Sequence, residues 1–307
     1  MSVKRPCGLI LLYKESGVTS FDSLGALKKA FATGKAGHTG TLDKFAEGLL
    51  LVLVGSAVKL NFLFEGLTKD YTGTIIFGEE TDTLDPEGAV IATASPPSRE
   101  RVEAALDNFR GDILQAPPAY SALHINGRRA HELAREGMAP EMKKRPVTVH
   151  ELEIISWSPM ETVIHAKVSA GTYIRSLARD LALAAGSRGH LSALKRTKVG
   201  PFCLEDAFSF AARSEITEDR LLKVLRPPDP NLFDTLSLPC IFLDEKSKND
   251  FIHGRPLDQL LKLASSVSAA GDNCTAGVFG EKDPGDLLGV VSCRNGNWSY
   301  VHVFANN

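Results

Sequence analysis

The stretch GKAGHTGTLDKFAEGLLLVLVG, from Gly34 to Gly55, carries the strongest structural and chemical signals in the chain. Three glycines stand among its first seven residues, and one acid, Asp43, follows a Thr-Gly-Thr-Leu run. The apolar run Leu49–Val54 comes next and predicts a buried strand, because it lacks the polar alternation of a half-exposed one. The loop before it is a phosphate-binding loop, an ordinary tight turn, or a device that presents one carboxylate.

The spacing of the glycines does not favour phosphate binding. A Walker loop places its lysine after the last glycine, whereas Lys35 follows the first. A dinucleotide fingerprint opens a helix after a strand, whereas this G-x-x-G-x-x-G pattern follows a predicted helix. Glycines suit a plain turn because they tolerate positive φ. A stiff turn that leads into a buried strand also suits a nucleophilic carboxylate, so both interpretations stay open on these residues alone.

The composition is that of an ordinary globular protein. The chain has 307 residues, of which 43% are hydrophobic and 23% charged, and at about 150 residues per domain this length predicts two domains. The longest apolar run is far shorter than a membrane helix, and Gly8–Leu12 is shorter than a signal-peptide core, so we expect a cytosolic protein. None of the five cysteines forms a C-x-x-C pair, which predicts reduced thiols without a metal site or disulfide framework.

Positive charge is concentrated in the middle of the chain. The whole chain has a net charge of -2, but residues 121–200 hold 13 Lys and Arg against 7 Asp and Glu. The remaining residues are therefore acidic on balance. This distribution indicates a local polyanion-binding face or an ordinary solvated surface, and charge alone does not decide between the two.

Helical and strand patterns are interleaved along the chain, which predicts the α+β class. Thr19-x-x-Asp22 is a capping box for a helix that continues to Phe31, and Ser56 is expected to cap a helix over residues 57–64. Further helices are predicted at 99–109 and 174–185, and strands at 9–12, 71–78, 145–155, 163–168 and 199–202. A proline-rich segment at 226–230 marks a boundary between a domain of residues 1–230 and a small β-rich module of residues 231–307.

Five motifs together resemble those of one enzyme family. The opening stretch is similar to the catalytic motif of the TruB family of tRNA pseudouridine synthases. Four more segments resemble TruB motifs in the family's order: KDYTGTIIFGEETDTLDPEG (Lys69–Gly88), QAPPAYSALHINGRRAHELAREG (Gln115–Gly137), KKRPVTVHEL (Lys143–Leu152) and GTYIRSLARDLA (Gly171–Ala182). The resemblance implies a mixed, largely antiparallel central sheet flanked by helices. It also implies an RNA-clamping insertion at about residues 114–145 and a PUA-like C-terminal module.

The resemblance implies a reaction and its catalytic groups. The family isomerises a T-loop uridine of tRNA, conventionally position 55, to pseudouridine, by flipping the base, breaking its N-glycosidic bond and forming a C–C glycosidic bond. Asp43 matches the catalytic aspartate and Tyr71 the stacking tyrosine, whose phenol can also help to remove the C5 proton. Arg175 matches the active-site arginine, and we expect it to pair with Asp43 and to lower the pKa of that carboxyl. The implied protein is a cytoplasmic monomer that binds the tRNA T-arm without cofactor, metal, membrane or protein partner.

Other matched residues are implied to bind the substrate. His38 matches a histidine that helps to hold the flipped RNA, and Leu194 a leucine of the pocket wall against the uracil. Eight basic residues are candidates for phosphate contacts, which position RNA without reading its sequence: Arg128, Arg129, Lys143, Lys144, Arg145, Lys195, Arg196 and Lys198.

The chain departs from the family pattern at three places. Lys44-Phe45 follows the aspartate where the family usually has Pro-Leu. His124 replaces a usual lysine, and His131 replaces a usual tyrosine of the next helix. The departures therefore fall in the catalytic loop and in the RNA clamp.

Two rival functions use the same residues. An RNA-binding, tRNA-folding factor with secondary or lost catalysis needs the basic segment but not Asp43. A carboxylate-dependent glycosidase needs a second acid at about 5–9 Å from the first, and Asp82 and Asp85 are the candidates. The retained Asp43 favours the pseudouridine synthase over the binding factor.

Overall fold

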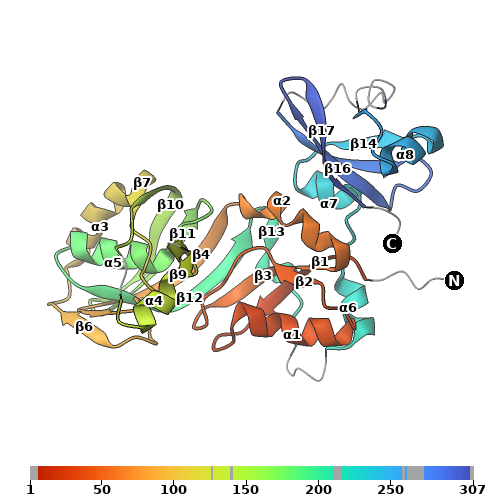
Figure 1. Cartoon of the computed structure of the whole chain (residues 1–307). Coiled ribbons are helices and arrows are strands. Elements are labelled where there is room, and N and C mark those ends of the chain that lie inside the picture. The colour runs from red at the N-terminus through yellow and green to blue at the C-terminus, as the bar shows by residue number, and fades with distance from the viewer. Residues whose placement is uncertain are drawn as a thin grey trace.

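Two sheets dominate the structure, a nine-stranded sheet and a four-stranded C-terminal sheet (Figure 1). The computed structural model describes residues 6–125, 127–138, 141–210, 216–257, 260 and 273–304. Within the predicted insertion at about 114–145, Asn126, Ala139 and Pro140 therefore lie outside the described residues. In the described ranges, no helix is long and apolar enough to cross a membrane.

The large sheet follows the order β1-β3-β12-β4-β11-β10-β7, with β2 and β13 paired at its side. Its strands are β1 Gly8–Lys14, β2 Ala36–His38, β3 Glu47–Val54, β4 Lys69–Phe77, β7 Gly111–Gln115, β10 Arg145–Trp157, β11 Glu161–Val168, β12 Gly189–Val199 and β13 Phe202–Cys203. Neighbouring strands are antiparallel, except that β12 runs parallel to β3. The predicted α+β class with a mixed, largely antiparallel sheet is confirmed.

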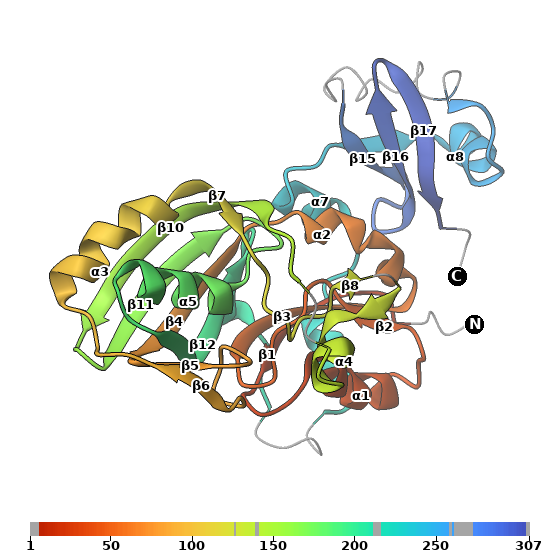
Figure 2. The ribbon, with the colours of Figure 1, turned by 60° about the vertical axis from the view of Figure 1, so that its left-hand side comes forward.

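Helices pack at both ends of this sheet. Helices α3 (Arg99–Leu106) and α5 (Ile174–Ala184) share a hydrophobic cluster with β4, β10, β11 and β12, and Figure 2 shows them on the same face. At the other end of the sheet, α1 (Ser20–Ala30) and α6 (Glu218–Val224) pack against β1 and β3.

Strand β3 is buried on both faces, which accounts for its unbroken apolar sequence. Leu50, Val52 and Val54 pack in the cluster with α1 and α6. Leu49, Leu51 and Leu53 point to the other face, into a cluster that includes residues of the C-terminal module. The strand predicted from the opening stretch is confirmed, and it gives the glycine-rich loop a rigid base.

Of the two predicted helix caps, the one at Thr19 is confirmed and the one at Ser56 is wrong. Thr19 is the N-cap of α1, and its hydroxyl accepts the backbone N–H of Asp22 at 3.0 Å, as predicted. The helix predicted over residues 57–64 is wrong: a 3-10 helix, η1 (Gly55–Leu60), precedes the one-turn helix α2 (Phe62–Glu65). Gly55 adopts a φ of +66° at the end of β3 and starts this turn, so Ser56 lies inside η1 and not at an N-cap.

The strand predicted over residues 199–202 is also wrong. Strand β12 ends at Val199, Gly200 turns the chain with a φ of +52°, and β13 begins at Phe202. Against β4, β12 shifts register between Leu191 and Ala193 and again after Arg196. These irregularities break the period-two pattern from which a long strand is predicted.

Short elements make up the connections. Strands β5 (Glu79–Thr81) and β6 (Val90–Thr93) form one small sheet. Strands β8 (His124–Ile125) and β9 (Arg128–Arg129) pair antiparallel, and α4 (Ala130–Arg135) follows them. The 3-10 helices η2 (Asp107–Phe109) and η3 (Leu204–Asp206) follow α3 and β13.

The C-terminal module packs directly on the large sheet. It contains α7 (Pro230–Thr235), β14 (Cys240–Leu243), α8 (Glu245–Ile252), β15 (Thr275–Gly280), β16 (Leu287–Arg294) and β17 (Asn297–Val303), and its sheet has the order β14-β15-β16-β17. Phe233, Phe279 and Val290 share one buried cluster with Leu9 and Leu51 of the large sheet. The division at residue 230 stays a prediction, and this cluster spans it.

Candidate active site

Asp43 lies in the loop between β2 and β3, and its side chain is 34% exposed. Arg175, in the first turn of α5, approaches it from the protein interior with a side chain that is only 5% exposed. Nη2 of Arg175 donates to Oδ1 of Asp43 at 3.0 Å, and Nε lies 2.9 Å from Oδ2. The predicted ion pair is confirmed, and it leaves one side of the carboxylate open to a ligand.

The same guanidinium connects three other groups. Nη1 of Arg175 donates to Oδ2 of Asp85 at 3.0 Å and to the carbonyl of Thr83 at 2.8 Å. Nη2 also donates to the carbonyl of Tyr120, in the predicted insertion, at 3.0 Å. Arg175 thus ties the catalytic loop, the β5–β6 connection and the insertion to one helix.

Asp85 is a site residue whose partner the sequence did not reveal. Its side chain is 7% exposed, and besides Arg175 it accepts bonds from the Thr83 hydroxyl at 2.6 Å and from the backbone N–H of Glu87 at 3.0 Å. In each of these contacts Asp85 is the hydrogen-bond acceptor. Asp85 is therefore held as an acceptor for Arg175, which does not suit the proton-donating acid that a glycosidase needs.

The expected lowering of the Asp43 pKa is wrong. Burial of the carboxyl is the largest influence and raises the pKa of Asp43 above its ordinary value. The Arg175 guanidinium acts in the opposite direction, and the neighbouring charge of Asp85 adds to the increase. Desolvation outweighs the ion pair, as happens when a charged group leaves water for a confined site.

Hydrogen bonds from residues outside the loop hold the backbone on both sides of Asp43. The hydroxyl of Ser20 donates to the carbonyl of Leu42 and accepts its N–H, both at 2.9 Å. The carbonyl of Lys44 accepts the backbone N–H of Gly17 at 2.8 Å, and that of Phe45 accepts the Ser16 hydroxyl at 2.6 Å. The residues on both sides of Asp43 are therefore fixed by the first residue of α1 and by the segment that precedes this helix.

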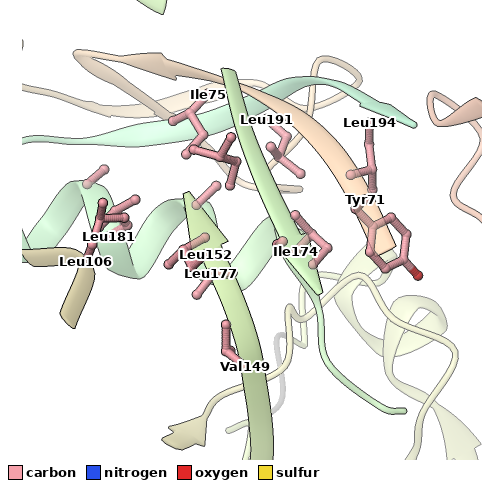
Figure 3. Packing of buried hydrophobic residues seen from close by; sticks show 14 of the residues in the cluster. Tyr71, Ile75, Leu106, Val149, Leu152, Ile174, Leu177, Leu181, Leu191 and Leu194 are labelled. Carbon is pink, nitrogen blue, oxygen red and sulfur yellow. The ribbon is translucent and has the colours of Figure 1, made fainter. Parts of the chain in front are cut away.

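Tyr71 and Leu194 lie together at the end of the largest buried cluster. Figure 3 shows the Tyr71 ring beside Leu194, with its phenolic oxygen pointing away from the packed residues. Tyr71 is 9% exposed and Leu194 6% exposed. Gly73 pairs with Leu194 across β4 and β12, and a Cβ at Gly73 would lie 3.2 Å from Leu191 and 3.6 Å from Leu194, so the glycine leaves room for this wall.

His38 is half-buried at the end of β2. Burial lowers the pKa of His38, and the positive charge of Arg196 lowers it further, so the ring is neutral at pH 7. Its Nδ1 is buried and has no hydrogen-bond partner within the described ranges. A neutral imidazole with a free ring nitrogen is suited to hydrogen bonding and not to pairing with phosphate charge.

Comparison with known proteins identifies the family. A model described as "TruB family pseudouridylate synthase (N terminal domain)" matches residues 28–174. A tRNA pseudouridine synthase B of Gluconacetobacter diazotrophicus is 38% identical over 294 residues, which cover 94% of this chain and 94% of the relative. The chain belongs to the TruB family.

A further relative agrees with this TruB family member in sequence, and a solved structure agrees with it in fold. A tRNA pseudouridine synthase B of Borreliella burgdorferi (strain ZS7) is 47% identical over 203 residues, which cover 65% of this chain and 72% of the relative. A chain from a crystal structure of a Cbf5-Nop10-Gar1 complex superposes with a TM-score of 0.68 at 22% identity, covering 98% of this chain and 84% of that chain. The predicted pseudouridine synthase fold is confirmed.

The predicted phosphate contacts of the TruB chain occupy different environments. Lys143, Lys144 and Lys198 are exposed, and Arg145 is half-buried at the start of β10. Arg128 and Lys195 form ion pairs, with Glu136 and Glu47 respectively. Arg129 is exposed. Arg196 is only 2% exposed, so its prediction as a surface phosphate contact is wrong.

Two of the three departures from the TruB pattern make contacts of their own. Nζ of Lys44 lies 2.9 Å from Oε1 of Glu87, an ion pair that joins the catalytic loop to the β5–β6 connection. His131 lies at the start of α4, with its Nδ1 3.0 Å from the carbonyl of Ser121. His124 is exposed in β8. The loop after Asp43 is therefore held in place without the usual proline.

Gln115 is a further residue that sequence reasoning missed. It is 1% exposed at the end of β7, where the insertion begins. Its side-chain amide accepts the backbone N–H of Tyr173 at 2.8 Å and donates to the carbonyl of Tyr173 at 3.1 Å. The amide therefore fixes the start of the insertion to the residue before α5, which carries Arg175.

Proposed function

We propose that this TruB family member isomerises the T-loop uridine at position 55 of tRNA, with Asp43 as the catalytic carboxylate. Relatives that carry the name tRNA pseudouridine synthase B support the substrate class. The observation that carries the proposal is the half-exposed Asp43 carboxylate, held by a buried arginine at the end of a buried aromatic and aliphatic cluster.

The proposed reaction breaks the N1–C1′ bond of uridine and forms a C5–C1′ bond, while a proton leaves C5 and N1 takes up a proton. Substrate and product are isomers, so the reaction needs no oxidant, reductant or second substrate. The Asp43 carboxylate can attack C1′ of the ribose or can remove a sugar proton from the neighbouring carbon. Both routes require the ionised carboxylate, and Arg175 stabilises this form against the effect of burial.

The proposed pocket for the flipped base lies at Tyr71 and Leu194. A target base must leave the helix stack before chemistry at its ring, and an aromatic face stabilises it outside the stack. In our proposal the Tyr71 ring stacks on the uracil, and its hydroxyl, which points away from the core (Figure 3), assists removal of the C5 proton. Leu194 forms the pocket wall, and His38 holds the nucleotide in its flipped conformation.

We propose that the exposed residues Lys143 and Lys144 and the half-buried Arg145, together with Arg128 of the insertion, bind the phosphates of the T-arm. Binding through phosphates releases counterions, so the affinity for T-arm RNA is expected to fall as salt rises. Replacing Lys143 and Lys144 together by Met is expected to reduce the slope of log K against log salt by about 2, one for each lost contact. An unchanged slope would exclude both contacts.

The function is tested with Asp43→Asn and wild-type protein on a T-arm RNA. Single-turnover formation of pseudouridine is measured by chemical mapping, and binding is measured in parallel. Wild-type protein is expected to convert position 55, whereas Asp43→Asn is expected to bind RNA and to form no product. Glu153→Gln, a change at an exposed carboxylate of β10, is the matched control and is expected to act like wild type.

The same experiment separates the rival function. Binding of the T-arm by wild-type protein without product would favour the tRNA-folding factor. Wild-type activity in Asp43→Asn would exclude Asp43 as the catalytic group. A monomer in the cytoplasm is part of the proposal, and sedimentation of the purified protein and fractionation of cells measure these two points.

A further inference from the structure

Arg196 is a buried arginine directly beneath the catalytic loop. It lies in β12, between β3 and β4, and is 2% exposed. Its Nε donates to the carbonyl of Leu49 at 2.8 Å, and Nη2 donates to the carbonyl of Gly40 at 3.1 Å. Nη1 makes a longer bond of 3.4 Å to the carbonyl of Thr41. The guanidinium therefore joins both ends of the loop that carries Asp43.

The guanidinium of Arg196 is bonded to backbone carbonyls, which are unusual partners for a buried charge. Buried arginines normally face carboxylates, because removing a charge from water is costly without a counter-charge. Over the described residues, no carboxylate lies within ion-pair distance of Arg196, and its bonds go to backbone carbonyls. The effect of this charge extends to its neighbours, since it contributes to lowering the pKa of His38 and of Lys69. The guanidinium of Arg196 therefore acts as a hydrogen-bond donor to backbone and not as the partner of an acid.

The backbone is built to bring Arg196 this close. Arg196 pairs with Gly48 where β12 runs parallel to β3. Gly48 has a φ of +112°, and a Cβ there would lie 2.3 Å from the carbonyl oxygen of Arg196. Only glycine permits this approach. At the loop itself, a Cβ on Gly40 would lie 3.8 Å from Nη1, so the guanidinium also packs against the loop.

We propose that Arg196 is a positioning residue for the isomerisation, which fixes the carbonyls of Gly40 and Thr41 and thereby sets the place of the Asp43 carboxylate. The inference rests on the proposed catalytic role of Asp43. Arg175 holds the carboxylate itself, and Arg196 holds the glycine-rich backbone that leads to it. Glycine and threonine residues leave such a loop mobile unless its carbonyls find donors elsewhere.

The proposal and a phosphate contact predict opposite results for Arg196→Met. A positioning role predicts that the single-turnover rate at saturating T-arm RNA falls by about 100-fold, the loss that a misplacement of about 1 Å can cause. The Kd is expected to stay within about threefold, and the salt dependence of binding is expected to stay unchanged. A phosphate contact predicts weaker binding, a smaller salt slope and a normal rate at saturation.

Two further variants keep the test decisive. Arg99→Met removes an exposed arginine of α3 and is expected to leave the rate unchanged. Arg196→Ala is expected to regain part of its rate with millimolar guanidinium, which a general loss of folding does not explain. If Arg196→Met fails to fold by circular dichroism, Arg196→Lys replaces it, with a rate between those of wild type and the rescued alanine variant.

Each outcome decides the proposal. A wild-type rate in Arg196→Met, or a folded variant that loses only affinity, overturns the positioning role. Absence of guanidinium rescue in a folded Arg196→Ala also overturns it. Absence of product from the wild-type protein would instead overturn the proposed function, so the two failures are distinguishable.

Discussion

Replacement of Asp85 by Asn tests how the active site depends on the acid behind Arg175. The two side chains are 7% and 5% exposed, and the ion pair between them measures 3.0 Å. Asparagine keeps the volume and one acceptor oxygen, so the bonds from the Thr83 hydroxyl and the Glu87 N–H can persist. The change therefore removes the charge, and it places the amide NH2 where Oδ2 accepts from Nη1 of Arg175, so that hydrogen bond is lost.

The expected loss of stability is about 2 kcal/mol, the typical contribution of a hydrogen bond to a charged group. Breaking a buried ion pair costs more stability when one charge is left unpaired. This larger cost is not expected here, because Arg175 keeps Asp43 as a counter-charge. For a chain of 307 residues, about 2 kcal/mol corresponds to a fall in Tm of roughly 3 °C. Arg175 also loses an anchor, so the single-turnover rate at the optimum pH is expected to fall about tenfold.

The pH profile gives the sharper test. The charge of Asp85 contributes to raising the pKa of Asp43, so its removal lowers that pKa. The reaction needs ionised Asp43, and activity is lost as pH falls through this pKa. The acid limb of log(kcat/KM) is therefore expected to move to lower pH in Asp85→Asn, although the maximum rate falls. Asp82→Asn, in the same connection but without a contact to Arg175, is the matched control. An acid limb that stays in place or moves to higher pH would refute the reasoning.

Three further predictions concern the surroundings of the site. Gly48→Ala is expected to lower the free energy of unfolding by more than about 1 kcal/mol, because the methyl group of alanine would collide with the backbone of Arg196. Urea denaturation measures this free energy, and an unchanged midpoint would contradict the prediction. Tyr71→Phe is expected to bind RNA normally. Its single-turnover rate is expected to fall about 100-fold, because the variant lacks the phenol that assists proton transfer and general acid–base catalysis contributes at least this factor. An unchanged rate would contradict a role of the phenol and leave the ring a stacking role alone. Burial lowers the pKa of Lys14 to about 8. Between about pH 8 and the ordinary lysine pKa, this group therefore binds fewer protons in the folded protein than in the unfolded chain, and its contribution to the free energy of unfolding increases as pH rises. Lys14→Met is expected to remove this increase, which thermal melts across the pH range measure.

Much of the site could be predicted because its signals are local. The apolar run Leu49–Val54 needs no tertiary information to be recognised as a buried strand, and the cap at Thr19 is a contact within four residues. The pairing of Arg175 with Asp43 joins residues that are 132 apart in the sequence, and it was predictable only from the matched family motifs. Composition and periodicity contain no information about that contact.

The failures share a physical cause, which is that they depend on tertiary surroundings. Strand β12 contains Lys195, Arg196 and Lys198 and two register shifts, so its sequence has the charge of a surface segment and no regular alternation. A central position in the sheet becomes possible only because Arg196 finds carbonyl acceptors from another segment. The direction of the Asp43 pKa shift failed for a similar reason, since burial is a property of the folded chain and its effect exceeds that of the adjacent arginine.

The catalytic loop combines two requirements that its own residues cannot both satisfy. Glycine at position 48 allows β12 to pack closely, but the glycines leave the backbone of the loop without stiffness of its own. Rigidity therefore comes from donors elsewhere in the sequence: the hydroxyl of Ser20 before the loop, and the guanidinium groups of Arg175 and Arg196 far after it. Because these donors come from α1, α5 and β12, the geometry of Asp43 is established only when the central sheet and its helices have assembled. A loop of this kind is expected to be rigid in the folded protein and featureless in isolation, which makes the catalytic carboxylate a property of the whole fold.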